Sequence, residues 1–300
     1  MVLINFTEMG EQLSTKAKKT LALAGAGDEH SVETAILVKQ REIADPILIG
    51  DAARVRELLT ELGQKASDYE IIQASSPKET AQITVKLAKE KKVDCILKGG
   101  IQTGDLISAV INKETGIKTQ NLLSHLTVLE VPSYHKILSV TDGAIVLAPS
   151  LEQKLVILDN ALRVLRWLGY DCPKVGILES NELVNPKIPS SVEAAILKEM
   201  NLDGRITGCQ VEGPISLDLA TDSRACREKG YQSPVGGDVD LLLCPFITVA
   251  NAMVKAIQTF VAGTKTAGVV VGASVPIILI SRASSPEEKA NSIKLATIVG

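Results

Sequence analysis

Residues 281–288 combine a hydroxyl, a guanidinium and carboxylates in the turn between a short apolar strand and the last predicted helix. The planar fork of Arg282 can hold two oxygens of a phosphate at once, and the neighbouring Ser281 can donate a further hydrogen bond. Ser285 and Glu288 have the spacing of a capping box at the start of the helix. Because the helix dipole favours an ionised carboxylate there, Glu288 could cap the helix, accept a proton as a base, or do both.

A second candidate anion site follows the apolar strand expected at residues 93–97. Lys98 and Gly99 end this strand, and Thr103 opens the next helix. Glycine permits close approach of a ligand or backbone, and a helix N-terminus favours phosphate. A plain turn with Thr103 as the helix N-cap explains the same residues, so both interpretations stay open.

A third stretch, residues 211–255, is typical of strand, turn, helix, polar loop, buried strand and helix in succession. The dipeptide at 213–214 is Gly-Pro, which predicts a turn that ends the preceding strand. The small-residue loop at 233–238 allows another backbone or a ligand to come close. Asn251 and Lys255 are four residues apart, so they share one face of the last helix in this stretch.

Short apolar strands alternate with helices and position these residues, which indicates βαβ units and a mostly parallel sheet. The expected strands cover residues 20–24, 47–49, 70–73, 93–97, 175–178, 206–211, 241–243, 268–272 and 275–280. Residues 125–131 and 136–141 are expected as an antiparallel pair. We place a domain boundary near residue 149, so the pattern predicts an α/β fold with two doubly wound domains and ligands at the carboxyl ends of their strands.

The composition of the chain argues against several classes of binding partner. The chain has 300 residues, 3% aromatics and a net charge of −3, which argues against nucleic acid and anionic membranes as partners. Its apolar runs are shorter than the roughly 18 residues that span a bilayer, and the N-terminus is unlike a signal peptide, so we expect a cytoplasmic protein. The five cysteines are scattered, which gives little indication of a metal site or disulfides.

The chain resembles the phosphate acetyl/butyryl-transferase family from about residue 20 to its C-terminus, and most closely the phosphate butyryltransferase branch. The shared pattern in residues 211–255 is the Gly-Pro turn, Asp218 after it, the small-residue loop, the strand ended by Pro245 and the helix with Asn251. Further motifs of that branch stand at 98–103, 112–116, 122–125 and 130–132. The match is specific because several separate motifs occur in the family's order.

This resemblance implies two α/β domains of isocitrate/isopropylmalate dehydrogenase-like architecture, with the substrates in a cleft between them. The first domain would comprise residues 1–148 plus about 268–300, and the second residues 149–267. The implied activity moves a short acyl group, butyryl or branched, between coenzyme A and inorganic phosphate by way of an acyl phosphate. Coenzyme A is then a substrate, no cofactor or metal is needed, and a homo-oligomer, a dimer or higher, is expected.

The resemblance also assigns roles to residues. The coenzyme A thiolate attacks the acyl carbonyl directly in a ternary complex, without a covalent enzyme intermediate. Glu288 would be the base, Arg282 the phosphate clamp, and Ser281 a donor to the carbonyl or the phosphate. The expected substrate contacts are Ser124, Thr103, Lys98, Gly99, Asn251 and Lys255.

Departures from the family pattern keep a second function open. Val146 stands in a region where the resembling enzymes commonly have Asn, and Ala250 replaces a usual Gly. These changes suit a non-catalytic acyl-coenzyme A-binding relative. Retention of Ser281, Arg282 and Glu288 argues against that alternative, because a sensor has no use for a base.

A third possibility is a metal-dependent dehydrogenase of the same architecture. Such an enzyme needs a cluster of Asp residues for its metal and a nicotinamide site. Asp238 and Asp240 are two residues apart, but the sequence shows no further Asp cluster beside them. Gly25 and Gly27 match the first two glycines of a dinucleotide-binding fingerprint, but the third glycine of that fingerprint is absent.

Overall fold

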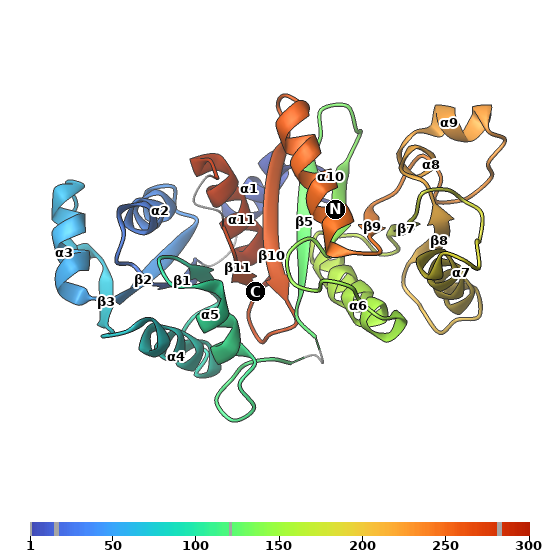
Figure 1. Cartoon of the computed structure of the whole chain (residues 1–300). Coiled ribbons are helices and arrows are strands. Elements are labelled where there is room, and N and C mark those ends of the chain that lie inside the picture. The colour runs from blue at the N-terminus through green and yellow to red at the C-terminus, as the bar shows by residue number, and fades with distance from the viewer. Residues whose placement is uncertain (1, 15–17, 120–121, 281–283) are drawn as a thin grey trace. The chain divides into compact units, whose positions relative to one another are not determined.

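The computed structural model describes residues 2–14, 18–119, 122–280 and 284–300, and the chain divides into two compact units (Figure 1). Unit 1 comprises Met1–Phe6 and Leu122–Thr266, and unit 2 comprises Thr7–Asn121 and Ala267–Gly300. The boundary expected near residue 149 therefore lies inside unit 1. The reason is that the antiparallel pair at residues 124–141 is hydrogen-bonded to the sheet of unit 1.

Unit 2 is a mostly parallel sheet with helices on both faces. Its strands are β1 (Lys19–Ala24), β2 (Ala44–Gly50), β3 (Glu70–Gln73), β4 (Cys95–Lys98), β10 (Lys265–Val271), which begins at the end of unit 1, and β11 (Ile277–Ile278). They follow the order β3-β2-β1-β4-β11-β10, and β10 runs antiparallel to β11. The helices are α1 (Phe6–Ser14), α2 (Glu29–Gln40), α3 (Ala52–Glu61), α4 (Pro77–Lys89), α5 (Thr103–Val110) and α11 (Pro286–Val299), with a 3-10 turn at Ala66–Asp68.

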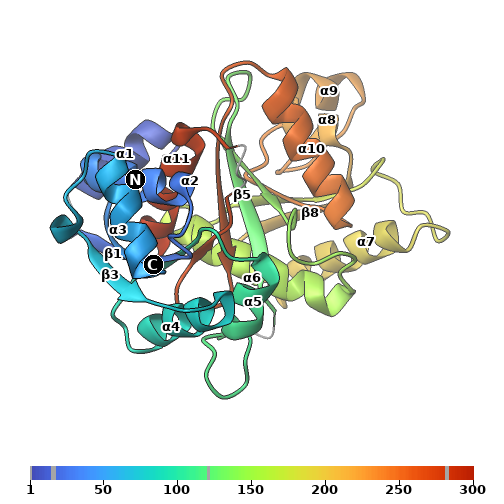
Figure 2. The same cartoon turned by 60° about the vertical axis from the view of Figure 1, so that its left-hand side comes forward.

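The central strands of unit 2 are apolar on both sides because helices cover both faces. Leu23 of β1 pairs in register with Leu48 of β2 and Leu97 of β4, and all three are buried. Helices α2 and α11 pack together on one face, and α4 and α5 on the other (Figure 2). The chain crosses from one face to the other between β1 and β4, so the carboxyl ends of these strands form a topological switch point, where open α/β sheets bind ligands.

Unit 1 contains a second sheet in the order β5-β6-β9-β7-β8. Its strands are β5 (Ser124–Glu130), β6 (Ile137–Thr141), β7 (Lys174–Leu178), β8 (Gln210–Ile215) and β9 (Leu241–Leu243). β5 is antiparallel to β6, as expected, and the other pairs are parallel. The helices are α6 (Leu151–Trp167), α7 (Pro189–Leu202), α8 (Leu217–Thr221), α9 (Ser223–Glu228) and α10 (Ile247–Phe260).

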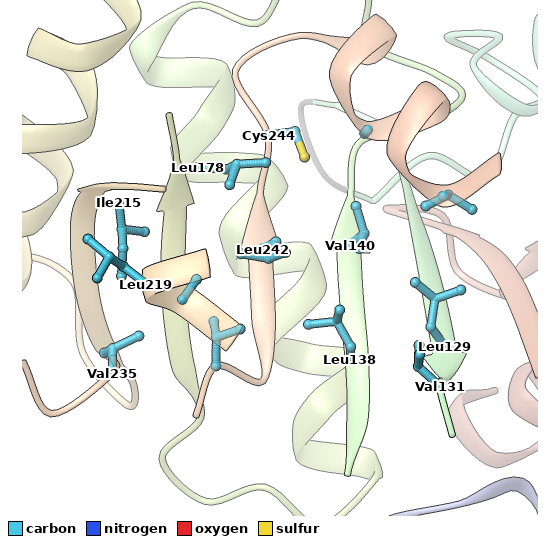
Figure 3. Packing of buried hydrophobic residues seen from close by; sticks show 14 of the residues in the cluster. Leu129, Val131, Leu138, Val140, Leu178, Ile215, Leu219, Val235, Leu242 and Cys244 are labelled. Carbon is cyan, nitrogen blue, oxygen red and sulfur yellow. The ribbon is translucent and has the colours of Figure 1, made fainter. Parts of the chain in front are cut away.

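One face of this sheet packs against α8 and α10 through a contiguous apolar core (Figure 3). Alternate residues of the strands point into it, among them Leu129 of β5, Val140 of β6 and Leu242 of β9. Leu219 of α8 and Val254 of α10 pack against these strand residues. The burial of these side chains fixes α10, the helix that carries Asn251 and Lys255, on this face of the sheet.

The predicted turn at residues 213–214 is wrong. Gly213 and Pro214 lie inside β8, which extends from Gln210 to Ile215. β8 is the last strand of the sheet, and an edge strand tolerates proline because one of its sides makes no ladder bonds. Gly213 is required there, since a Cβ would stand 2.7 Å from the Cβ of Ile177 on β7. The expected α/β class, with alternating strands and helices, is confirmed.

None of the helices in the described part of the chain is long and apolar enough to cross a membrane.

Candidate functional site

Glu288 and Ser285 form the hydrogen bonds that cap the start of α11. The backbone amide of Ser285 donates to Glu288 Oε2 at 2.9 Å, and the amide of Glu288 donates to Ser285 Oγ at 3.2 Å. The predicted capping box is therefore confirmed. Ser281 and Arg282 lie outside the described residues, so their roles stay predictions.

The carboxyl end of β4 holds Lys98 in a defined position. Its Nζ donates to the carbonyl oxygens of Gly99 and Ile101 at 3.0 and 3.1 Å. Thr103 is exposed and is the first residue of α5, whereas Gln102 is the N-cap and makes no side-chain capping bond. The alternative in which Thr103 caps the helix is therefore wrong. A helix end without such a cap suits an anion, which its first-turn amides attract.

The glycines after Lys98 are explained by a neighbouring loop. A Cβ on Gly99 would stand 2.6 Å from the carbonyl oxygen of Gly25, and a Cβ on Gly100 would stand 2.6 Å from Asp28 Oδ2. Two βα loops therefore approach each other closely at the switch point. At Gly99 the structure shows a close approach of backbone to backbone, one of the two alternatives that a glycine permits.

A pocket of unit 2 opens beside this contact. Leu23 and Leu97 supply apolar surface, while His30, Lys98 and Lys289 supply basic groups. Lys289 follows Glu288 directly, and Ile280, which precedes the undescribed residues 281–283, also lines the pocket. The fold therefore brings the β4 turn and both flanks of the 281–288 stretch to one place.

Residues of the β1–α2 loop complete this pocket, and sequence reasoning missed them. Asp28 caps α2 and accepts hydrogen bonds from the amide and the hydroxyl of Ser31, at 3.0 and 2.7 Å. His30 is exposed and lies 3.3 Å from a carboxylate oxygen of Glu33. The available signal was the glycine turn at 25–27 between a buried strand and a helix, which we interpreted only as a turn.

Ser124 begins β5 in unit 1 and is 1% exposed. Asn160 of α6 donates from Nδ2 to Ser124 Oγ at 3.0 Å and to the carbonyl oxygen of Leu122 at 3.1 Å. A side chain of α6 therefore fixes the position of the Ser124 hydroxyl. The next residue, His125, is on the opposite face of the strand, and burial lowers the pKa of its imidazole.

Asp142 organises the turn after β6. Its carboxylate accepts the backbone amides of Ala144 and Ile145 at 2.8 and 2.9 Å, and that of His125 on β5 at 3.0 Å. The amide of Val146 donates to the same carboxylate at 3.3 Å. Sequence reasoning missed Asp142. The amides of residues 144–146 come from its own turn, but only the pairing of β5 with β6 adds the amide of His125.

Asn251 and Lys255 are both exposed on α10. Asn251 donates from Nδ2 to the carbonyl oxygen of Gly143 at 3.1 Å, which ties α10 to the turn after β6. Ser124 and Asn251 therefore lie at the same end of the unit 1 sheet, where β5 begins and β6 and β9 end. In each unit, the predicted residues that the structure describes gather at the carboxyl ends of the parallel strands.

Comparison with known proteins identifies the family. The model of the phosphate acetyl/butaryl transferase family matches residues 6–92 and 77–297. The chain belongs to this family and is an acyltransferase of the phosphate butyryl/acetyltransferase kind.

Relatives of this chain include enzymes named for different acyl groups. A phosphate butyryltransferase from Clostridium acetobutylicum is 36% identical over 98% of this chain and 98% of its own length. A phosphate acetyltransferase from Thermotoga maritima is 34% identical over 98% of this chain and 99% of its own length. Similarity of this degree extends to enzymes named for either acyl group, so it does not determine the acyl substrate.

Solved structures agree with the fold. A branched-chain phosphotransacylase from Enterococcus faecalis V583 superposes with a TM-score of 0.83 at 30% identity, over 94% of this chain and 98% of that chain. A 4-hydroxythreonine-4-phosphate dehydrogenase from Burkholderia phymatum superposes with a TM-score of 0.58 at 14% identity, over 95% of this chain and 99% of that chain. The second likeness shows the shared architecture alone.

The aspartates considered for a dehydrogenase metal site have other partners. Asp238 is bonded to Lys174 Nζ at 2.6 Å, to His135 Nε2 at 2.7 Å and to Lys136 Nζ at 2.8 Å. Asp240 is bonded to Lys136 Nζ at 2.6 Å. These contacts join the amino ends of β6, β7 and β9, at the edge of the sheet away from Ser124 and Asn251. Together with the family membership, they count against the dehydrogenase alternative.

Proposed function

We propose that the chain moves a butyryl or short branched acyl group between coenzyme A and inorganic phosphate. The observation that carries this proposal is the pocket of unit 2, in which Lys98 lies with Ile280 and Lys289, the two residues that flank the 281–288 stretch. The β4 turn and the flanks of residues 281–288, which are far apart in the sequence, both line this pocket, and this supports the proposal. Membership of the acyltransferase family supplies the reaction class.

The proposed reaction has a single transfer step. The sulfur of coenzyme A forms a bond to the acyl carbon, the bond from that carbon to the phosphate oxygen breaks, and the phosphate leaves with its electron pair. The thiol proton passes to the carboxylate of Glu288. The reverse direction is phosphorolysis of the thioester.

In this mechanism the remaining residues bind and orient the substrates. Arg282 holds the phosphate through two hydrogen bonds, and Ser281 donates to the carbonyl or to the phosphate. Lys98, Gly99 and Thr103 lie where cations and helix amides favour phosphate. These roles rest on the family motifs and on the position of each residue at a strand end.

Unit 1 contributes a second set of substrate contacts to the proposal. Asn251 and Lys255 present an amide and a cation on one exposed face of α10. Ser124 is buried and bonded to Asn160, so its proposed part is to position the start of β5 as well as to approach phosphate. The proposal also includes a homo-oligomer, a dimer or higher, as the working form.

The proposal is tested by thiol release from acetyl-, butyryl- and branched acyl-coenzyme A with and without phosphate. We expect phosphate-dependent release, with kcat/KM about ten-fold higher for butyryl than for acetyl, since two buried methylenes contribute about 0.8 kcal/mol each. Equal values, or an acetyl preference, would contradict the acyl assignment. Binding without turnover of all three thioesters would favour the non-catalytic alternative.

A further inference from the structure

A carboxylate stands among the basic groups of the unit 2 pocket. Of the described residues that line this pocket, Asp28 is the only acid, and His30, Lys98 and Lys289 are the basic ones. A negative charge beside a bound anion weakens binding through Coulomb repulsion. Capping of α2 does not require that charge, since Asn and Ser cap a helix about as well as Asp. A role for the Asp28 carboxylate in the choice of anion accounts for its presence here.

Hydrogen bonds to Ser31 fix the orientation of the Asp28 carboxylate. Oδ1 accepts the backbone amide of Ser31 at 3.0 Å, and Oδ2 accepts its hydroxyl at 2.7 Å. Ser31 is itself buried. Oδ2 also lies against the β4 turn, where a Cβ on Gly100 would stand 2.6 Å from it. The carboxylate is therefore held at the wall of the pocket without a ligand, so binding need not order it.

This carboxylate can accept further hydrogen bonds. An ionised carboxyl group has about four lone-pair sites and no proton to donate. Ser31 occupies two of these sites, and Asp28 forms no ion pair within the part of the chain that the structure describes. The remaining sites can bond only to a ligand that brings a hydrogen.

The cations of the pocket supply the attraction for an anion. Lys289 is half-buried on α11, and it has no carboxylate partner among residues 2–14, 18–119, 122–280 and 284–300. Lys98 lines the same pocket, where the carbonyl oxygens of Gly99 and Ile101 hold its Nζ. Two ammonium groups with one fixed acceptor suit an anion that also carries a hydrogen-bond donor.

Tetrahedral oxyanions differ in whether they carry such a donor. At neutral pH inorganic phosphate and arsenate keep at least one proton, whereas sulfate keeps none. A hydroxyl of phosphate or arsenate can donate to a free lone pair of Asp28. A sulfate oxygen in the same position would meet the carboxylate with no proton between them, so the two like charges would repel each other.

We infer that Asp28 makes this pocket select inorganic phosphate over sulfate by accepting a hydrogen bond from a phosphate hydroxyl. The inference rests on the proposed function, because it takes inorganic phosphate as the anion of this pocket. It goes beyond that function by assigning specificity to a residue outside the motifs that indicated the reaction.

Phosphorus-31 NMR of inorganic phosphate with the full-length protein tests the selection, because a bound fraction broadens the phosphate signal. Arsenate and sulfate are added separately as competitors, at neutral pH and constant ionic strength and without a thioester. For the wild type, we expect arsenate to reverse the broadening at a concentration at least about ten-fold below that of sulfate, the usual effect of a hydrogen bond to a charged group. Asp28→Asn should bring the two concentrations to within about three-fold, because an amide can also donate to sulfate.

Asp51→Asn is the matched control. Asp51 also caps a helix that follows a strand of this sheet, accepting the amides of Ala53 and Arg54 at 3.0 and 3.4 Å, and it is not among the residues that line the pocket. This variant should keep the wild-type ratio of the two competitors. Thermal unfolding checks that each variant is folded, and Asp28→Ser, which also retains a cap, replaces Asp28→Asn if the latter is not.

Equal competition by arsenate and sulfate in the wild-type protein overturns the inference, and so does the absence of phosphate binding. A folded Asp28→Asn or Asp28→Ser protein that keeps the wild-type ratio also overturns it, as does an equal loss of selection in Asp51→Asn. The proposed function is judged separately by thiol release. A protein that selects phosphate through Asp28 but transfers no acyl group would contradict the proposed function and support this inference.

Discussion

Glu288 is the single residue on which the chemical interpretation depends most. Its Oε2 accepts the Ser285 amide at 2.9 Å, so its part in capping α11 is established, and its part as a base is a prediction. The two roles are compatible, because a carboxylate has two oxygens and can accept more than one hydrogen bond or proton contact. An ionised carboxylate can take the proton of a thiol whose ordinary pKa is near 8.5.

Glu288→Gln separates the two roles, because Gln serves in a capping box but cannot accept the thiol proton as a carboxylate does. Base catalysis is typically worth about 10²–10⁴-fold, so we expect kcat to fall at least about a hundred-fold with little change in Tm. Steady-state kinetics and thermal unfolding of the same preparation provide the comparison. Retention of more than about a tenth of the wild-type kcat would place the base elsewhere.

The matched control is Ser285→Ala, which removes the other half of the box. Loss of an N-cap side chain costs about 1 kcal/mol of stability, so Tm should fall by a few degrees. Glu288 remains in this variant, and we expect kcat to stay within a few-fold of wild type. If Ser285→Ala lost as much kcat as Glu288→Gln, the effect of both would be structural.

Arg282→Gln addresses the phosphate clamp. A hydrogen bond to a charged group contributes about 1.5–3 kcal/mol, so we expect the KM for phosphate to rise roughly ten- to hundred-fold. The KM for coenzyme A should change less, because the lost fork contacts phosphate. Initial rates with either substrate varied give both constants, and an unchanged phosphate KM with wild-type kcat would remove Arg282 from the site.

Residues differ in how far the sequence predicts their roles. The capping box at Ser285 and Glu288 is a local pattern, and the structure reproduces it. The parts of Asn160 and Asp142 depend on contacts with β5 that come from distant segments. Neither is marked by spacing along the chain, so only the fold reveals them.

At the scale of elements, the two βα loops at the switch point of unit 2 constrain each other. Gly99 has little room for a side chain, because a Cβ would stand 2.6 Å from the carbonyl oxygen of Gly25 and 2.7 Å from Ser31 Oγ. The β4 turn and the β1–α2 loop are also joined by a backbone hydrogen bond, from the amide of Gly100 to the carbonyl oxygen of Gly25 at 2.7 Å. The same loops line the proposed anion pocket, so their packing sets its shape.

Gly99→Ala should destabilise the protein by about 1–3 kcal/mol, the usual cost of forcing an extra carbon into a packed contact. Gly104→Ala is the matched control. Gly104 lies in the first turn of α5, where a Cβ would meet nothing within 4 Å, and alanine in a helix is favoured by roughly 0.5–1 kcal/mol over glycine. Urea unfolding of both variants measures the difference, and equal stabilities would contradict the loop contact.

Elements defined by periodicity agree best with the structure. The expected strand at residues 70–73 is β3, and the expected antiparallel pair is β5 with β6. β8 was misjudged because Gly-Pro is a strong local turn signal, while the edge position that tolerates Pro214 is a property of the whole sheet. The loop at 233–238 packs against backbone rather than a ligand at Gly237, where a Cβ would stand 2.5 Å from Ser223 Cα.

At the scale of the whole molecule, charge networks join strands far apart in the sequence. Asp238 contacts Lys136 ahead of β6 and Lys174 at the start of β7, and it also contacts His135. Burial alone would raise the pKa of Asp238, but the hydrogen bonds from Lys136, Lys174 and His135 outweigh it and hold the pKa below its ordinary value. The folded state therefore binds the Asp238 proton more weakly than the unfolded chain does.

This difference makes part of the stability of unit 1 depend on pH. A carboxyl whose folded pKa is depressed stabilises the fold above its unfolded pKa of about 3.9, and the contribution is lost as pH falls below that value. Asp238→Asn should therefore be less stable than wild type at pH 7, by about 1–2 kcal/mol after allowance for the 38% exposure of the side chain.

Urea unfolding at pH 7 and at about pH 3 tests this account, and the advantage of the wild type should shrink at the lower pH. Asp159→Asn is the control, because Asp159 forms an exposed pair with Arg163 within α6, and such pairs contribute about 0–1 kcal/mol. A constant difference between Asp238→Asn and wild type across this range would contradict the assignment to Asp238.

The central claim is acyl transfer to phosphate, and the acyl phosphate itself is its most direct evidence. Phosphorus-31 NMR of the purified protein with butyryl-coenzyme A and inorganic phosphate reports that product without depending on thiol release. The account predicts a new acyl phosphate signal that grows with free coenzyme A and disappears when excess coenzyme A reverses the reaction. Thiol release without an acyl phosphate signal, or no reaction with any of the three thioesters, would contradict it.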